Sequence, residues 1–231
     1  MIIAVIPARI GSNRIKKKNI KKFYGKPIIA WPIIAAKKSN IFDKIIVSTD
    51  SSQIALISKK YGAEVPFLRK KKLSNNKVGT SEVIVDAIEN LNKLNINPTS
   101  ICCIYPTAAL IDSRDIVNGF KVHLKYKNQF VFTATEFASP VLRSFSYESK
   151  KVRMLFPKNY KKRSQDLKNY YHDAGQFYWN SAKAWKKLKP VYSDNSKVVF
   201  VPRWRAIDID TKDDWKTALQ SAKILKLGKK F

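Results

Sequence analysis

Short apolar runs recur along the chain and alternate with longer segments in which apolar and polar residues are mixed. The runs are rich in β-branched residues and are almost uninterrupted by polar ones, a pattern typical of strands buried on both faces of a sheet. They predict strands at residues 2–7, 44–49, 100–105, 130–135 and 198–202.

The segments between these runs predict helices, at residues 27–39, 51–61, 80–95 and 112–126, with a final one at 211–226. Several begin with residue types that cap a first helical turn, namely Asp50-Ser51-Ser52, Thr80, Asp112-Ser113 and Thr211. This alternation of strands and helices predicts a three-layer α/β fold, in which a mostly parallel sheet carries helices on both faces.

The alternation breaks after about residue 137. The segment 138–176 is irregular, charged and aromatic, and a weak apolar alternation at about 142–156 predicts a hairpin that leaves the sheet as an arm. The chain contains no repeat and no linker rich in Gly and Ser. We therefore expect a single domain over residues 1–231, with the arm inserted at about 138–170.

Composition supports a globular protein. At 231 residues and 45% hydrophobic content, the chain is long and apolar enough for a core. Cys102 and Cys103 are neighbours in a predicted strand, so their side chains point to opposite faces. This arrangement suits neither a disulfide nor a shared metal ion. The absence of a predicted disulfide favours a cytoplasmic protein. No apolar run reaches the about 18 residues of a membrane span, and the first run predicts a strand, not a signal peptide.

The net charge of +28 raises the question of a nucleic-acid partner. The basic residues are mostly lysine and are scattered along the whole chain, whereas specific nucleic-acid readers concentrate Arg and aromatic residues on one face. A basic nucleic-acid-binding module is therefore the disfavoured alternative, although the positive field favours anionic substrates.

Candidate site residues follow the predicted strands, because open α/β sheets bind ligands outside the carboxyl ends of their strands. The loop after the first strand, ARIGSNR, leads from Arg9 and Gly11 to Lys18, and its backbone N–H groups and cations suit a polyphosphate. The loop has neither the spacing of a P-loop nor that of a dinucleotide-binding motif.

A second candidate is the sequence IDIDT at residues 207–211. Asp208 and Asp210 are two positions apart, so on an extended segment both carboxylates point the same way and can share a Mg²⁺ that also binds phosphate oxygens. Alternatively, these acids only flank a helix N-terminus, as Asp213 and Asp214 are expected to do. Together, the basic loop and the acidic pair predict a site for a nucleoside triphosphate and a metal ion.

These motifs resemble the acylneuraminate cytidylyltransferases. IPARIGSNRIKKKNI is similar to the IPARGGSKRIPRKNI-type opening of that family, FDKIIVSTDS to its second-strand motif, GAEVPFLRKKKLSNNKVGTSEV to its base-recognition loop, and IDIDT to its metal motif. The resemblance runs from residue 2 to about 218 and implies a nucleotide-diphospho-sugar transferase-like fold. RSQDLKNYYHDAGQFYW (163–179) and CCIYPTA resemble the pseudaminic acid branch.

The resemblance implies that CTP and a nine-carbon 2-keto acid sugar, pseudaminic acid above all, give a CMP-sugar and pyrophosphate, with Mg²⁺ as the cofactor. It implies catalytic roles for Arg9, Lys18 and the two metal-binding residues Asp208 and Asp210. The further nucleotide contacts that it implies are Gly11, Ser12, Asn13, Asn19, Arg69 and Thr80. The sugar contacts that it implies are Tyr105, Thr107, Arg143, Arg163, Gln165, His172 and Gln176.

The resemblance also implies a homodimer, in which the arm reaches across and contributes Arg143 or Arg163 to the partner's site. No side chain is assigned as the general base, and a positioning role is favoured over a base role for His172. Alternatively, the residues from Arg163 to Gln176 belong to an ordinary aromatic core segment, as Tyr178 and Trp179 are expected to.

The chain departs from the family pattern at a few positions. Asn13 stands where the family has lysine, which removes one cation from the phosphate loop, and Arg14 or Lys16 is the candidate to replace it. Ile10 and Ala109 replace a usual glycine and proline, Lys16 replaces another proline, and residues 74–76 lack the usual acidic residues.

Two other enzyme functions remain open. The same chemistry on N-acetylneuraminate, legionaminate or KDO would use the same motifs. A metal-dependent glycosyltransferase would also contain an acidic pair of this spacing, but it would use an existing nucleotide sugar, and the triphosphate-type basic loop disfavours it.

Overall fold

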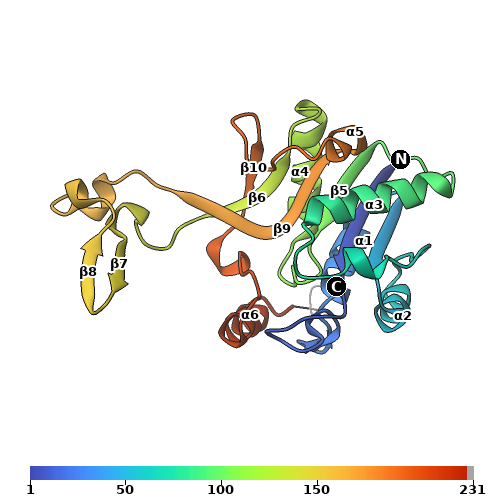
Figure 1. Cartoon of the computed structure of the whole chain (residues 1–231), viewed down its shortest axis with the longest axis horizontal. Helices are drawn as coiled ribbons and strands as arrows, with labels where there is room; N and C mark the ends of the chain where they lie inside the picture. Colours follow the sequence, from blue (N-terminus) through green and yellow to red (C-terminus); the bar gives the residue numbers. More distant parts are fainter. Residues whose placement is uncertain (228–231) are drawn as a thin grey trace.

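The computed structural model describes residues 1–227 and is built around a six-stranded sheet with the order β10-β6-β9-β5-β1-β4 (Figure 1). The predicted strands are all present: β1 (Ile2–Ala8), β4 (Lys44–Thr49), β5 (Ser100–Ile104), β6 (Val131–Glu136) and β10 (Lys197–Phe200). β1 pairs in parallel with β4 and β5, and β10 pairs in parallel with β6.

The strand β9 (Tyr171–Ser181) was not predicted from the sequence. It lies between β5 and β6 and is antiparallel to both. Its first half, which was assigned to the irregular segment 138–176, mixes His172, Asp173 and Gly175 and shows no alternation. Its second half is buried against a strand on each side, whereas in its first half only Ala174 is buried. The sheet is therefore mostly parallel, as predicted, with one antiparallel strand.

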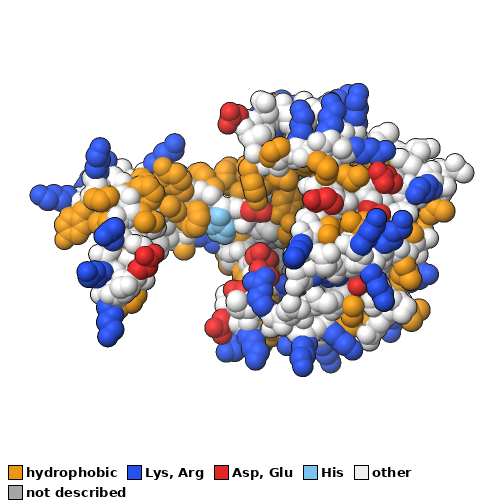
Figure 2. Space-filling view, in the orientation of Figure 1, with side chains coloured by type: hydrophobic (Ala, Val, Ile, Leu, Met, Phe, Trp, Pro, Cys, Tyr) orange, Lys and Arg blue, Asp and Glu red, His pale blue; other side chains and the backbone are white. Residues whose placement is uncertain are grey.

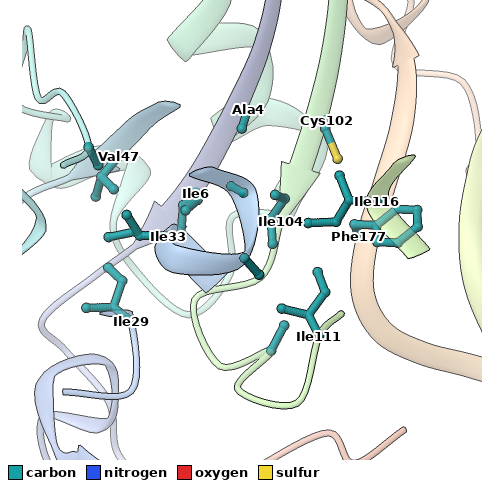
Figure 3. Packing of buried hydrophobic residues seen from close by; sticks show 14 of the residues in the cluster. Ala4, Ile6, Ile29, Ile33, Val47, Cys102, Ile104, Ile111, Ile116 and Phe177 are labelled. Atoms are coloured by element: carbon teal, nitrogen blue, oxygen red, sulfur yellow. The ribbon is translucent and has the colours of Figure 1, made fainter. Parts of the chain in front are cut away.

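Helices cover both faces of the sheet, as predicted. α1 (Ala30–Ser39), α2 (Ser52–Lys60) and α4 (Ser113–Lys125) enclose one core with the sheet, part of which Figure 3 shows. α3 (Thr80–Lys93) and α5 (Ala182–Lys186) enclose the other. Cys102 lies in the first core and Cys103 in the second, both fully buried and free, which confirms that these neighbours point to opposite faces.

The capping predictions hold at three helices and fail at one. The side chains of Ser51 and Asp112 accept backbone N–H groups at the starts of α2 and α4, and Thr211 forms a capping box with Asp214 at the start of α6 (Lys212–Ile224). The prediction at Thr80 was wrong: Gly79 occupies the N-cap of α3, and Thr80 is the first helical residue. The Thr80 side chain is therefore free to face the sheet.

The first helix begins at Ala30, three residues later than predicted. The preceding residues form a small hairpin, in which β2 (Lys22–Phe23) pairs with β3 (Lys26–Pro27). The fully buried Phe23 ring fixes this hairpin edge-on against Trp215 of α6. The hairpin thus ties the loop after β1 to the C-terminal helix.

The arm consists of the antiparallel hairpin β7 (Phe145–Glu148) and β8 (Lys151–Met154), with short 3₁₀ turns at 141–143, 157–159 and 164–166. The predicted hairpin at 142–156 is confirmed. The arm extends away from the body between the end of β6 and the start of β9 (Figure 1). Over residues 1–227, no helix is both long and apolar enough to cross a membrane.

Candidate functional site

A cavity of about 360 Å³ opens where β1 and β5 end, at the carboxyl edge of the sheet that the sequence indicated. The loop after β1, the loop before α3 and the segment before α6 form its walls. The structure brings most of the predicted site residues to this cavity: Arg9, Ser12, Asn13, Lys18, Asn19, Arg69, Thr80, Tyr105, Thr107, Asp208 and Asp210.

Two hydrogen bonds hold the loop after β1 in place. The buried Asn19 donates from Nδ2 to the Arg9 carbonyl at 2.9 Å, and Ile10 N donates to Asp50 Oδ1 at 3.1 Å. Gly11 does not line the cavity, and a Cβ built on it would meet no atom within 4 Å. The backbone at Gly11 is therefore open to close approach from outside.

The two predicted carboxylates stand in different environments. Asp210 accepts the Lys18 ammonium at 3.0 Å on Oδ1 and the Arg14 guanidinium at 2.9 Å on Oδ2. Asp208 lies on the cavity wall without a direct ion pair among the described residues. Although part of Asp208 is open to solvent, removal of water by the surrounding walls, together with the charge of Asp210, raises the pKa of its carboxyl group.

The donor set of this acidic pair fits a hard divalent cation that is shared with a ligand. Two carboxylates converge on the cavity, and residues 1–227 contain no cluster of three or more His, Cys, Asp or Glu side chains that could hold a metal ion. Mg²⁺ is usually held in this way, by one or two carboxylates together with substrate phosphates and water. A cation bound here would compete with Lys18 and Arg14 for Asp210.

The opposite wall is built around a buried arginine. Arg69 is 5% exposed, and its guanidinium donates to the Ser48 carbonyl at 3.1 Å and to Ser74 Oγ at 3.0 Å. Burial lowers the pKa of Arg69. The Arg9 guanidinium contacts the side chain of Asn76 on the same loop. These contacts fix the loop between α2 and α3 against the carboxyl end of β4.

The remaining predicted site residues lie outside the cavity. Gln176 is 2% exposed and donates from Nε2 to the Arg205 carbonyl at 2.7 Å, so it belongs to the core beneath the acidic pair. His172 packs against Phe137 where β9 leaves the body. Arg143, Arg163 and Gln165 lie on the arm, where Arg163 pairs with Asp166 at 2.9 Å.

Sequence reasoning missed an ion pair that supports the acidic segment. Asp115 of α4 pairs with Arg205, and the two side chains are only 13% and 11% exposed. Arg205 precedes Asp208 by three residues, so this pair ties the acidic segment to a helix on the face of the sheet. A signal was present: Asp115 shares one helix face with the buried residues Gly119 and His123 at a spacing of four.

Comparison with known proteins identifies the family. The family model described as Cytidylyltransferase matches residues 3–231. The chain belongs to the cytidylyltransferase family. It is 41% identical, over 96% of its length and 95% of the relative's, to a pseudaminic acid cytidylyltransferase of Campylobacter jejuni (serotype O:23/36, strain 81-176). A CMP-N,N'-diacetyllegionaminic acid synthase of Legionella pneumophila is 32% identical, with 93% of each chain covered.

Solved structures place the cytidylyltransferase chain in the expected fold class. A CMP:2-keto-3-deoxy-manno-octonic acid synthetase complexed with CTP superimposes with a TM-score of 0.71 over 98% of this chain and 99% of that one. Because the two sequences are only 14% identical, this likeness concerns the fold. It confirms the nucleotide-diphospho-sugar transferase-like architecture that the motifs implied.

Proposed function

We propose that this cytidylyltransferase transfers CMP from CTP to a nonulosonic acid, with pseudaminic acid as the favoured acceptor. The observation that carries the proposal is the cavity in which the cations Arg9 and Lys18 lie with the carboxylates Asp208 and Asp210. The choice of acceptor rests on the 41% identity to the Campylobacter relative named for pseudaminic acid. Legionaminate and N-acetylneuraminate are the alternative acceptors.

In the proposed reaction, the anomeric hydroxyl oxygen attacks the α-phosphorus in line, the bond from this phosphorus to the β-phosphate oxygen breaks, and the hydroxyl proton is released. Arg9 and Lys18 neutralise the triphosphate, and the loop at Ser12 cradles it, with the open backbone at Gly11 beside the cavity. The walls at Arg69 and Thr80 hold the cytosine and ribose.

Asp208 and Asp210 are the residues that would hold Mg²⁺, with the triphosphate supplying further oxygens. When bound, the ion neutralises charge that develops on the departing pyrophosphate. Lys18 then has to exchange part of its contact with Asp210 for a phosphate oxygen, and Arg14 at the cavity rim is free to do the same.

The deciding experiment measures pyrophosphate release from CTP and Mg²⁺ with pseudaminic acid, N,N'-diacetyllegionaminic acid, N-acetylneuraminic acid and KDO in turn. We expect turnover with pseudaminic acid. No release with any of these acids would contradict the transferase assignment, whereas turnover only with another acid would correct the acceptor.

Asn13 lies on the cavity wall beside Arg14, where the family has lysine. We propose that Arg14 supplies the missing cation. Asn13→Lys should therefore change the Kd for CTP less than about twofold, while Arg14→Met should weaken CTP binding by about tenfold or more, since a charged hydrogen bond contributes about 1.5–3 kcal/mol. Calorimetric titration with CTP measures both, and a large gain in affinity for Asn13→Lys would show that nothing replaces the lysine.

We further propose that the enzyme is a homodimer joined through the arm. An isolated two-stranded hairpin is marginally stable in water, yet one face of β7–β8 exposes Phe145 (59%), Tyr147 (66%) and Val152 (65%). Figure 2 shows hydrophobic side chains gathered on the arm. A second copy would cover this face, and Arg143 or Arg163 would then reach the partner's cavity.

The double variant Tyr147→Lys/Val152→Lys tests the arm, because these two residues are paired across the hairpin. We expect it to sediment as a monomer and to lose most of its turnover. Ser146→Lys, which adds a lysine at the neighbouring position on the other hairpin face, should remain dimeric. A wild-type protein that sediments as a monomer at micromolar concentration would contradict the proposal.

A further inference from the structure

Two side chains from distant parts of the fold hold Arg205, which precedes Asp208 by three residues. The Arg205 guanidinium pairs with the carboxylate of Asp115 on α4, and the Arg205 carbonyl accepts Gln176 Nε2 of β9 at 2.7 Å. Asp115 is 9% exposed and Gln176 is 2% exposed. This arrangement, called the Arg205 clamp below, fixes both the side chain and the backbone of one residue.

The position of the Asp208 carboxylate depends on such anchors. In the part of the chain that the structure describes, this carboxylate has no hydrogen bond or ion pair of its own. Residues 206–210 form neither helix nor strand, so the ends of the segment set its path. One end is fixed at Ile209, which is 1% exposed and accepts the Lys18 ammonium on its carbonyl at 2.5 Å. The Arg205 clamp fixes the other end.

The strand β9 contacts the acidic segment at two successive residues. A Cβ built on Gly175 would lie 3.5 Å from Asp208 Cγ, so the β9 backbone passes directly beside this carboxylate. The next residue, Gln176, makes the hydrogen bond to Arg205. Asp208 thus rests on the same stretch of β9 that holds Arg205, and loss of the clamp would let residues 206–208 shift against that strand.

The clamp brings no net charge to the acidic pair. Asp115 neutralises the Arg205 guanidinium, and the two side chains are only 13% and 11% exposed, so little solvent screens either charge. A buried guanidinium without a partner would disfavour a cation held by Asp208 and Asp210. The ion pair therefore allows an arginine to anchor this segment without opposing a metal ion.

We propose that Arg205, held by Asp115 and Gln176, is a positioning residue that places the Asp208 carboxylate for a divalent cation. This inference rests on the proposed function and deepens it, because it names residues that set the affinity for the metal ion. Arg205 does not line the cavity, and it acts through the backbone of residues 206–208.

The double variant Asp115→Val/Arg205→Met tests the clamp. It keeps the net charge, and because an apolar pair often replaces a buried ion pair at no loss of stability, it should melt near the wild-type temperature. With Mn²⁺ as the probe, the measured quantity is the Kd for CTP in EDTA divided by the Kd for CTP in Mn²⁺. This ratio should fall about tenfold or more, as is typical when groups that orient metal ligands are lost. The Kd in EDTA should stay within about twofold.

A second variant acts on the backbone side of the clamp. Gln176→Met removes the donor to the Arg205 carbonyl and keeps the length of the side chain. The same ratio of Kd values should fall about three- to tenfold, as expected for one hydrogen bond. In both variants, the EPR spectrum of Mn²⁺ bound with CTP should differ from that of the wild type, with no acceptor present.

The matched control is Lys44→Met/Glu64→Gln, which also removes an ion pair and keeps the net charge. Lys44 pairs with Glu64 at 2.9 Å at the start of β4, on the edge of the sheet opposite the cavity. This variant should keep the wild-type ratio of Kd values and the wild-type EPR spectrum.

The outcomes distinguish this inference from the proposed function. If the wild-type protein turns over no nonulosonic acid, the proposed transfer fails, and Mn²⁺ binding with CTP still reports on the clamp. If both clamp variants keep the wild-type ratio, or if the control loses it equally, the positioning role of Arg205 is overturned. Equal losses of CTP affinity in EDTA and in Mn²⁺ would also overturn it, because the clamp would then support the cavity as a whole.

Discussion

Asp208→Asn is expected to lower kcat on the order of 10²–10³-fold, while the folded protein stays at least as stable as the wild type. The change removes one negative charge from the proposed metal ligands and keeps the shape of the side chain. Loss of one electrostatic contact that stabilises a transition state typically has an effect of this size. Pyrophosphate release at saturating CTP and acceptor measures the loss.

The stability of the variant follows from the environment of this carboxylate. Removal of water by the cavity walls, and secondly the charge of Asp210, raise the pKa of Asp208 above its ordinary value, to an extent limited by the exposure of this residue to solvent. The folded state therefore binds this proton more tightly than the unfolded chain does. The resulting stabilisation is complete below the ordinary pKa and is lost as the pH rises through the raised one. Asparagine does not ionise, so at neutral pH and without metal the variant should melt at an equal or higher temperature.

Asp213→Asn is the matched control for this prediction. The Asp213 side chain is 88% exposed at the start of α6, where it pairs with Lys216 at 3.3 Å. Removing its charge should leave kcat within about twofold of the wild-type value, since exposed ion pairs contribute little. Equal losses in both variants, or a lower melting temperature for Asp208→Asn, would contradict the role given to Asp208.

Local patterns predicted the parts of the fold that depend on neighbouring residues. Uninterrupted apolar runs located the parallel strands, since burial on both faces removes polar positions from such runs. Asp208 and Asp210 were found in the same way, because two positions of extended chain are enough to place both side chains on one side. The cations of the first loop were found from their place after a strand.

Contacts between distant segments were out of reach. Asp115 and Arg205 lie 90 positions apart, and nothing in either segment indicates that α4 passes beside the acidic segment. The hydrogen bond from Tyr178 to Asp173 depends on a bulge in a strand that the sequence pattern hid. Such contacts depend on the path of the chain, which local periodicity does not record.

The same limit applies to the lysines of the opening stretch. Lys16, Lys17 and Lys18 are consecutive lysines in a chain with 45 basic residues, and the local pattern does not distinguish the ammonium group of one from those of the others. The structure separates them: Lys18 is 18% exposed and donates to the Ile209 carbonyl at 2.5 Å and to Asp210 at 3.0 Å, whereas Lys16 and Lys17 are exposed. Lys18 starts the 3₁₀ turn Lys18–Ile20, which directs its ammonium into the cavity.

Lys18→Met should therefore lower kcat/KM on the order of 100-fold, because it removes the ammonium while keeping the length of the apolar stem. Two functions are lost together: the cation that is proposed to bind the triphosphate, and the bond that holds the backbone between Asp208 and Asp210. Both the Kd for CTP and kcat should worsen, which calorimetry and pyrophosphate release measure separately.

Lys17→Met is the control, since it removes the same charge one residue earlier, at an exposed position outside the cavity. It should stay within about twofold of the wild type in both constants, as expected for an exposed charge. If Lys17→Met and Lys18→Met lost activity equally, the general positive field of the protein would account for the loss seen in Lys18→Met. A loss confined to Lys18→Met would instead place that effect in the contacts with Ile209 and Asp210, which only a cation at this position makes.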